Sequence, residues 1–183
     1  MATRWKPVLV VFVLGIVICA ASVAMAASAA EIDRDATAAL KRLYASTPKV
    51  KELAAAAKGV LVFPRIIKAG FLVAGQYGEG ALRVGGKTAG YYSTVAASYG
   101  YQAGAQTFGY ALFFMTESAL GYLDKSDGWE LGSAPSVVVV DQGTAAGLST
   151  STLQSDMYAF FFSQKGLMAG LGLQGSKITK IEK

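Results

Sequence analysis

The sequence predicts an α+β protein that is mainly β: a small, glycine-rich antiparallel β-barrel core with about three helices packed on its outside. Apolar residues recur at helical spacing before Gly59 and in short strand-like runs after it. Glycine makes up 21 of the 183 residues, far above the roughly 7% of average proteins. Because glycine inside a strand allows a sharp bend or the close approach of another backbone, this composition favours a strongly curved barrel over a flat sandwich.

The N-terminus has the three parts of an export signal, so we interpret residues 1–26 as a signal peptide. Two basic residues come first, an almost wholly apolar run covers residues 8–20, and Ala24-Met25-Ala26 has the small residues that signal cleavage requires. We expect cleavage after Ala26, or alternatively after Ala29. The protein is then predicted to be exported, and to reside in the periplasm or peripherally on the cell envelope.

Two alternatives to cleavage remain open. The apolar run continues to Ala30 and is long enough to span a bilayer of about 30 Å, so the segment could instead be retained as an anchor. Cys19 could carry a lipid, although Ile18 is bulkier than the small residue usual before a lipidated cysteine. The small residues before the cleavage site favour removal of the segment.

The composition of the mature chain argues against several classes of catalytic, metal-binding and nucleic-acid-binding protein. The chain contains no histidine, and its single cysteine lies in the signal. The mature protein therefore lacks the commonest general base, the commonest transition-metal ligand and any thiol nucleophile. Two of the 17 basic residues lie in the signal, and the remainder only slightly outnumber the 12 acidic residues, unlike the strong basic block of a nucleic-acid binder.

The carboxylates offer no recognisable site either. Glu79, Glu117 and Asp156 are isolated acidic residues whose spacing gives no sign of a shared catalytic or calcium site. We therefore expect a protein that is not an enzyme, with no catalytic residues, no metal, no cofactor and no nucleic-acid partner.

Residues 27–58 are predicted to form an N-terminal helical segment that packs on the barrel. Thr47-Pro48 divides the segment, since these residues suit an N-cap and the first position of a new helix. Gly59 is expected to end the second helix as a C′ residue. An amphipathic helix on a lipid surface is the alternative, which the scarcity of large apolar residues disfavours. The first apolar stripe consists of Ile32, Ala36, Leu40 and Leu43.

Residues 59–183 are predicted to form the barrel core. Pro64 should close the first strand, because proline lacks the N–H that a sheet ladder needs. A short helix is expected from Glu117 to Lys125. One parity of the aromatic run 160–162 should pack under a helix. The expected strands are residues 60–63, 69–77, 81–84, 88–95, 105–115, 137–140, 158–163, 167–173 and 177–181.

The stretch ALRVGGKTAGYYS, residues 81–93, matches the loose form of a phosphate-binding loop. Such a loop must lead into a helix whose N-terminal amides bind the phosphate. The residues after Thr88 include Gly90, two aromatics and β-branched residues, which make a poor first turn. Gly85-Gly86 between two strand-like runs instead predicts a β-hairpin turn with positive φ at both glycines. We therefore expect no nucleotide partner.

Three blocks of the chain carry a family resemblance: AAKGVLVFPRIIKAGFLVAGQYGEGAL (56–82), ASYGYQAGAQTFGYALFFMTESALGYL (97–123) and YAFFFSQKGLMAGLGLQGSKI (158–178). Together, and in this order, they resemble the SYLF domain, also called the Ysc84 or DUF500 family. The resemblance extends from roughly residue 40 to the C-terminus. The chain is similar in particular to the bacterial branch, in which one such domain follows an export signal, whereas eukaryotic relatives attach the domain to SH3 or FYVE modules.

The resemblance implies a β-barrel core with helices outside it and no enzymatic activity. Relatives bind phosphoinositides or other anionic phospholipids, and some yeast members bind actin. For an exported chain, the resemblance implies a lipid-binding domain of the bacterial cell envelope that binds anionic headgroups weakly and peripherally. Two alternatives stay open. One is a structural or interaction module whose partner is another envelope protein, and the other is an integral outer-membrane β-barrel. The charged end KITKIEK argues against the second, because strands of such a barrel should face lipid.

Five basic residues near expected turns are the candidate headgroup ligands: Arg65, Lys68, Arg83, Lys87 and Lys165. If their loops share one rim, they form a cationic patch in which each Lys or Arg is worth about 1 kcal/mol near an anionic surface. Lys68 and Lys165 are the stronger candidates, because they lie inside the matched blocks. The alternative is that all five are ordinary solvated charges.

Overall fold

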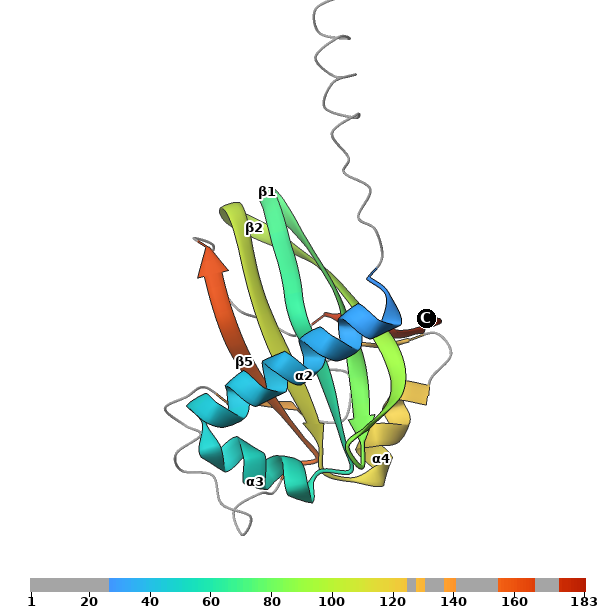
Figure 1. Cartoon of the computed structure of the whole chain (residues 1–183). Helices are drawn as coiled ribbons and strands as arrows, with labels where there is room; N and C mark the ends of the chain where they lie inside the picture. Colours follow the sequence, from blue (N-terminus) through green and yellow to red (C-terminus); the bar gives the residue numbers. More distant parts are fainter. Residues whose placement is uncertain (1–26, 125–127, 131–136, 141–154, 167–174) are drawn as a thin grey trace, which may run out of the picture.

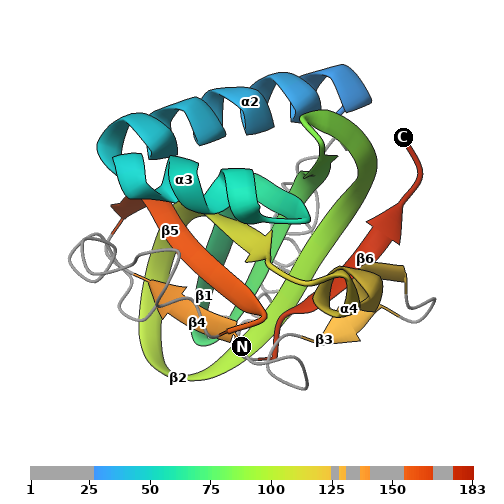
Figure 2. The same cartoon turned by 90° about the horizontal axis from the view of Figure 1, so that it is seen from below.

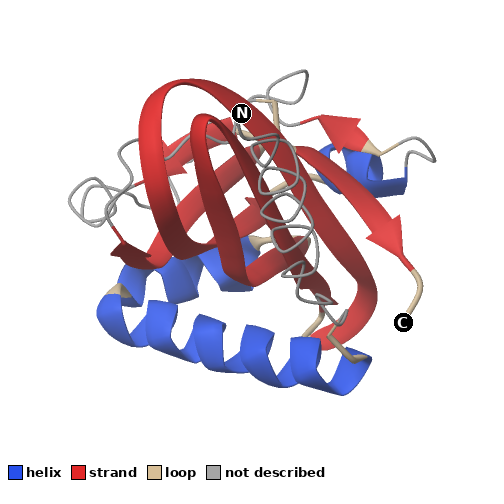
Figure 3. Cartoon of the chain, turned by 90° about the horizontal axis from the view of Figure 1, so that it is seen from above, coloured by secondary structure: helices blue, strands red, loops and turns tan. Residues whose placement is uncertain are grey.

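A computed structural model describes residues 27–124, 128–130, 137–140, 155–166 and 175–183. Within them, six strands form one sheet that curls into a half-barrel (Figure 3). The predicted class, α+β and mainly β with a strongly curved sheet, is confirmed. The predicted export signal and the strand predicted at residues 167–173 lie outside the described residues.

Long strands dominate the element order (Figure 1). The helices are α2 (Ala29–Ser46), α3 (Pro48–Ala56), α4 (Glu117–Leu120) and the 3-10 helix η1 (Gly121–Asp124). The strands are β1 (Gly59–Val84), β2 (Lys87–Phe114), β3 (Trp129–Glu130), β4 (Val137–Val140), β5 (Met157–Gly166) and β6 (Lys177–Ile181).

The sheet has the strand order β3-β6-β2-β5-β4, and β1 also pairs with β2. All pairs are antiparallel except β4 with β5, which is parallel, so the sheet departs from the wholly antiparallel prediction at this one edge.

β1 and β2 form one long hairpin where the sequence predicted several shorter strands. β1 runs through Pro64, so the expected strand end at this residue is wrong. The register shifts between Phe63 and Ile66, and Pro64 falls in that irregularity, where its missing N–H breaks no regular ladder. The predicted hairpin turn is confirmed: Gly85 and Gly86 have φ of 56° and 79°, and β2 follows directly, in place of the helix that a phosphate loop needs.

A sharp bend divides this hairpin into two halves. The register shifts between Phe71 and Val73, and Leu72 between them has a φ of 62°. A positive φ is rare for a side chain as large as leucine, so the chain here is held in an uncommon conformation. A Cβ at Gly70 would overlap the Val73 carbonyl, which means that the bend requires glycine at this position.

The bend brings the two halves of β1 against each other. A Cβ at Gly78 would lie 2.8 Å from the carbonyl oxygen of Arg65, and a Cβ at Gly80 would overlap the carbonyl of Val62. Neither position has room for a side chain. The two halves therefore approach backbone to backbone, at a separation that only glycine permits.

The two ends of the barrel differ. Gly59 at the start of β1 lies beside Val84 at its end, since a Cβ at Gly59 would be 3.5 Å from the Val84 side chain. We call this the hairpin end, and the opposite end, at residues 70–74, the bend end. At the hairpin end, Ala119 of α4 and Leu123 of η1 join the interior of the barrel (Figure 2), so the third helix lies over an end rather than on the outside.

Two apolar cores stabilise the half-barrel. The interior core fills the hollow with large side chains such as Phe63, Tyr110 and Trp129. The outer core lies between the other face of the sheet and helices α2 and α3. Because side chains alternate along β5, Phe160 packs in the outer core and Phe161 against the interior core. The prediction that one parity of this aromatic run packs under a helix is confirmed.

Local signals define the two helices of the outer core. Ser28 caps α2 in a capping box with Glu31, and Thr47-Pro48 separates α2 from α3 as predicted. Gly59 is not the C′ residue of α3, because the helix already ends at Ala56 and its C-cap, Ala57, has an extended backbone that leads toward β1. Gly59 instead lies against the hairpin end, where a Cβ would come within 2.9 Å of the Leu120 side chain.

The close contact within β1 makes a testable prediction. We expect Gly80→Ala to lower the free energy of unfolding by about 2–3 kcal/mol, because the added Cβ must displace the Val62 backbone. Gly75→Ala is the matched control in the same strand, since its added Cβ meets no atom within 4 Å, and we expect a change below about 0.5 kcal/mol. Urea unfolding followed by circular dichroism measures both, and equal losses would contradict the role of the contact.

Candidate functional site

The five predicted headgroup ligands do not share one rim. Arg83 and Lys87 flank the turn at the hairpin end. Arg65, Lys68 and Lys165 lie on the half of the sheet that runs toward the bend. The length of β1 is the reason, because Lys68 lies close to the bend in the middle of this strand whereas Arg83 lies at the end of the strand, beside the turn.

Arg83 fastens the hairpin end to helix α2. Its side chain is only 16% exposed, and its guanidinium lies 3.2 Å from the Asp33 carboxylate. The same group donates hydrogen bonds to the Asp33 carbonyl oxygen at 3.0 Å and to the Thr37 hydroxyl at 3.1 Å. Arg83 is thus committed to contacts within the protein, whereas Lys87 across the turn is exposed.

Asp33 makes most of the polar contacts between α2 and the hairpin. Its carboxylate accepts hydrogen bonds from the Thr88 hydroxyl at 2.7 Å and the Tyr91 hydroxyl at 2.9 Å, both on β2. The hydrogen bond to Asp33 raises the pKa of the Tyr91 hydroxyl. One helical carboxylate therefore links α2 to both strands of the hairpin.

Lys68 and Lys165 point to opposite faces of the sheet. Lys165 pairs with Thr107, which pairs with Ile67, so these three residues share the outer face. Lys68 is one residue further along β1 and therefore faces the interior, where it is 8% exposed. The sequence did not reveal this difference, because the faces of β1 depend on the irregularity at Pro64.

The interior of the barrel is polar toward the bend. Lys68 pairs in register with Gln106, which is 1% exposed and whose amide has no hydrogen-bond partner among the described residues. Gln76 on the other half of β1 donates a hydrogen bond to the buried hydroxyl of Ser176 at 3.1 Å. This polar lining replaces the apolar core of the hairpin end.

A second polar pair joins this lining. The Tyr110 hydroxyl donates a hydrogen bond to the Thr94 hydroxyl at 3.0 Å, with both groups buried. Burial raises the pKa of Tyr110. The hydroxyl of Tyr110 therefore stays protonated and remains a donor at neutral pH.

Near the bend, the outer face of the sheet exposes large apolar side chains. Helices α2 and α3 cover the outer core, and β1 and β2 extend beyond them (Figure 1). The exposed side chains there, which we call the bend surface, are Ile67, Phe71, Leu72 and Val73, at 53%, 73%, 49% and 50% exposure. Such a cluster of large exposed apolar side chains is typical of a contact surface.

Two exposed cations flank the bend surface. Lys165 lies in the same row of the sheet as Ile67, two strands and so about 10 Å away. Arg65 precedes Ile67 on β1 and is exposed as well. The part of the chain that the structure describes places no hydrogen-bond or ion-pair partner on either residue, so both charges face the surroundings.

A separate cavity of about 610 Å³ opens at the hairpin end, between the two long helices and the hairpin turn. Leu40 and Tyr44 of α2 and Val60 of β1 supply its apolar lining, and Lys41 and Arg83 supply its positive charge. Burial raises the pKa of the Tyr44 hydroxyl. The cavity and the bend surface lie at opposite ends of the barrel.

The carboxylates singled out in the sequence have separate partners. Glu79 pairs with Lys183, Glu117 lies 3.9 Å from Lys58, and Asp156 accepts a hydrogen bond from Thr116. Within the described ranges, no three His, Cys, Asp or Glu residues are grouped so that they could hold a metal ion. Among these same residues, no helix has the length and apolarity needed to cross a membrane.

Comparison with known proteins gives a family match for the second half of the chain. A family model described as Ysc84, Las17-binding protein actin regulator, matches residues 95–183. The matched region covers β2 from Val95 onward and everything that follows it, including Lys165 and the β5 and β6 strands. No curated protein matches the chain.

The contacts between Arg83 and α2 predict that Arg83, and not Lys87, contributes to the stability of the fold. We expect Arg83→Met to lower the free energy of unfolding by about 1–2 kcal/mol, because it leaves Asp33 and Thr37 without their partner. Lys87→Met removes an exposed charge from the same turn and should change stability by less than about 0.5 kcal/mol. Thermal and urea unfolding test this, and a loss in Lys87→Met as large as in Arg83→Met would refute it.

Proposed function

Because this chain belongs to the Ysc84 (SYLF) family, we propose that it is a non-enzymatic domain of the cell envelope that binds the surface of anionic phospholipid membranes through its bend end. The observation that carries the proposal is the bend surface with its two flanking cations. The proposal narrows the five candidate ligands to Arg65 and Lys165. Lys68 faces the interior, and Arg83 and Lys87 lie at the far end.

The composition of the bend surface suits shallow insertion into a bilayer. Phe71 and Leu72 stand at the tip of the bend, where they would reach the acyl boundary first. Complete burial of one such side chain is worth about 1.5–3 kcal/mol. Arg65 and Lys165 would then lie at headgroup level and add about 1 kcal/mol each. The sum favours reversible, salt-sensitive attachment.

The covered outer face argues against a barrel that spans the membrane. Such a barrel needs a continuous apolar band toward lipid, but α2 and α3 pack on this sheet through Ile32, Leu43 and Leu53. Solubility of the processed protein without detergent is the corresponding test, and a protein that requires detergent would favour the spanning alternative.

A protein partner is the second candidate function. The family's description names a Las17-binding actin regulator, and an exported chain would need a different partner in the envelope. Strand β4 supports this alternative, because among the described strands it lies at an edge of the sheet and it exposes Val138 and Val139 by 40% and 54%. An exposed edge strand can pair with a strand of another protein.

Vesicle flotation over a salt series tests the membrane proposal. We expect the processed protein to float with vesicles that contain phosphatidylglycerol, to bind neutral phosphatidylcholine vesicles less, and to detach as salt rises. Phe71→Ser should weaken binding to both vesicle types, because it removes insertion rather than charge. Binding that ignores both lipid charge and salt would exclude the headgroup mechanism.

A double charge-reversal variant tests whether the bend end is the membrane-binding surface. We expect Arg65→Glu with Lys165→Glu to weaken binding to anionic vesicles at least about tenfold, since each cation is worth about 1 kcal/mol and each is replaced by an anion. Lys41→Glu with Lys87→Glu makes the same change in net charge at two exposed positions of the hairpin end and should have a smaller effect. Equal losses in the two double variants would show that net charge, and not the bend end, directs binding.

A further inference from the structure

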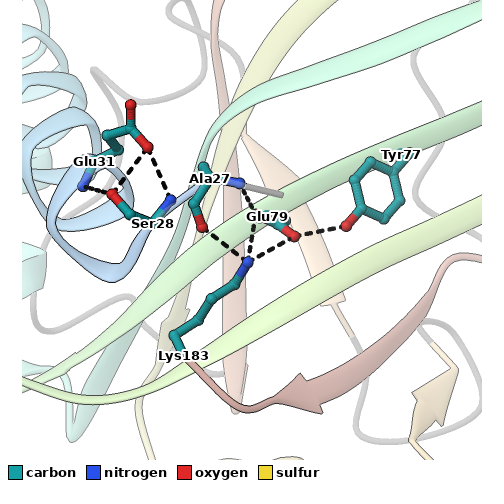
Figure 4. A network of polar contacts seen from close by, with 6 residues as sticks. All are labelled: Ala27, Ser28, Glu31, Tyr77, Glu79 and Lys183. Carbon is teal, nitrogen blue, oxygen red and sulfur yellow. Dashed lines mark hydrogen bonds and ion pairs between the residues drawn. The ribbon is translucent and has the colours of Figure 1, made fainter. Parts of the chain in front are cut away.

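A polar network joins the start of the described chain to Lys183, which follows the last strand (Figure 4). The backbone nitrogen of Ala27 donates a hydrogen bond to the Glu79 carboxylate at 3.1 Å, although 52 residues separate them. Lys183 reaches the same carboxylate, with its ammonium 3.1 Å from each oxygen, and donates to the Ala27 carbonyl oxygen at 2.9 Å. Ala27 thus lies between an acid of β1 and a base that follows β6.

The surroundings of the Glu79 carboxylate favour a positively charged partner. Its side chain is 9% exposed and that of Lys183 is 10% exposed, so the pair is largely shielded from water. The Tyr77 hydroxyl donates a further hydrogen bond to Glu79 at 2.7 Å. Burial alone would raise the pKa of Glu79, but the hydrogen bonds from Tyr77, Lys183 and Ala27 and the charge of Lys183 outweigh burial and lower this pKa. The carboxylate is therefore ionised at neutral pH.

The helix that follows distinguishes between the two predicted cleavage positions. Ser28 caps α2: its hydroxyl accepts the Glu31 N–H at 3.3 Å, and its own N–H donates to the Glu31 carboxylate at 2.8 Å. Cleavage after Ala29 would remove both Ser28 and Ala27, and α2 would lose its cap and its link to Glu79. Cleavage after Ala26 preserves both.

We propose that hydrolysis of the Ala26–Ala27 peptide bond creates an α-ammonium group on Ala27 that pairs with the largely shielded carboxylate of Glu79. Water supplies the oxygen that completes the carboxylate of Ala26, and the Ala27 nitrogen takes up protons to become the ammonium. The donor that Glu79 already faces then gains a full positive charge. Processing in this way converts a hydrogen bond into an ion pair and fastens the new N-terminus to β1 and Lys183.

The charges around Glu79 fit this change. The groups facing the carboxylate are the Ala27 nitrogen, the Tyr77 hydroxyl and the Lys183 ammonium. The Glu79 carboxylate raises the pKa of an ammonium beside it, and the nearby Lys183 ammonium opposes this rise. Because the Ala27 nitrogen contacts the carboxylate directly, we expect the carboxylate to dominate, so that the pair stabilises the fold fully below the ordinary α-amine pKa of about 7.7–8.0 and is lost as pH rises through the higher folded value. The Ala27 amide of an unprocessed chain carries no such charge.

Mass spectrometry and N-terminal sequencing of the exported full-length product test the position. We expect a mature chain that begins at Ala27. A chain that begins at Ala30, or one that keeps residues 1–26, overturns the proposal. The measurement needs no variant, and it does not depend on lipid binding.

Reactivity of the new α-amine tests the pairing itself. An aldehyde reagent selective for N-terminal amines should label native mature protein at least about tenfold more slowly than Glu79→Gln, because each unit by which the pairing raises the amine pKa lowers the free-amine fraction tenfold. Glu31→Gln is the control, since this exposed carboxylate contacts Ser28 but not Ala27, and its labelling rate should stay within about twofold of the native rate. Equal rates for native protein and Glu79→Gln would overturn the pairing.

Lys183→Met supplies a second variant should Glu79→Gln fail to fold. This change removes the competing cation and leaves the carboxylate to Ala27 and Tyr77. We expect the α-amine of this variant to be at least as protected as in the native protein, because the change removes a positive charge beside the amine. Labelling at the rate of the urea-unfolded chain would overturn the proposal.

Discussion

The close approach of β1 to itself is the contact on which the barrel depends. A side chain at Gly78 or Gly80 would collide with the backbone of Arg65 or Val62, so the two halves of the strand can meet only where Cβ atoms are absent. That meeting turns a long hairpin into a curled sheet with an inside and an outside. Both apolar cores follow, one in the hollow and one under the helices.

The same bend gives the two ends of the barrel different chemistry. At the hairpin end, Asp33 and Arg83 bind α2 to the strands, and α4 and η1 fill the opening with apolar side chains. At the bend end, none of the described helices covers the outer face, and the interior carries Lys68, Gln76 and Gln106 in place of an apolar core. A polar interior and an apolar exterior at one end reverse the usual distribution of side chains in a globular domain, and this reversal supports the proposal that the bend end is a contact surface.

The helix break and the hairpin turn could be predicted from the sequence, whereas the candidate site could be predicted only in part. Thr47-Pro48 and Gly85-Gly86 act within a few residues, so their roles as helix break and hairpin turn followed from composition alone. Lys68 and Lys165 were equally plausible as ligands, because the face that a strand residue occupies depends on register. One irregularity beside Pro64 assigned Lys68 to the interior, and no sequence pattern located it in advance.

The sequence by itself determined the fold class, the helical start and the abundance of glycine that permits a tight curl, because spacing and composition act locally. The tertiary structure alone decided which glycines meet a backbone, which cations face outward, and that Ala27, Glu79 and Lys183 lie together. Those outcomes depend on contacts between residues far apart in the chain. No local pattern specifies such contacts, because they depend on strand register and on the bend at residues 70–74.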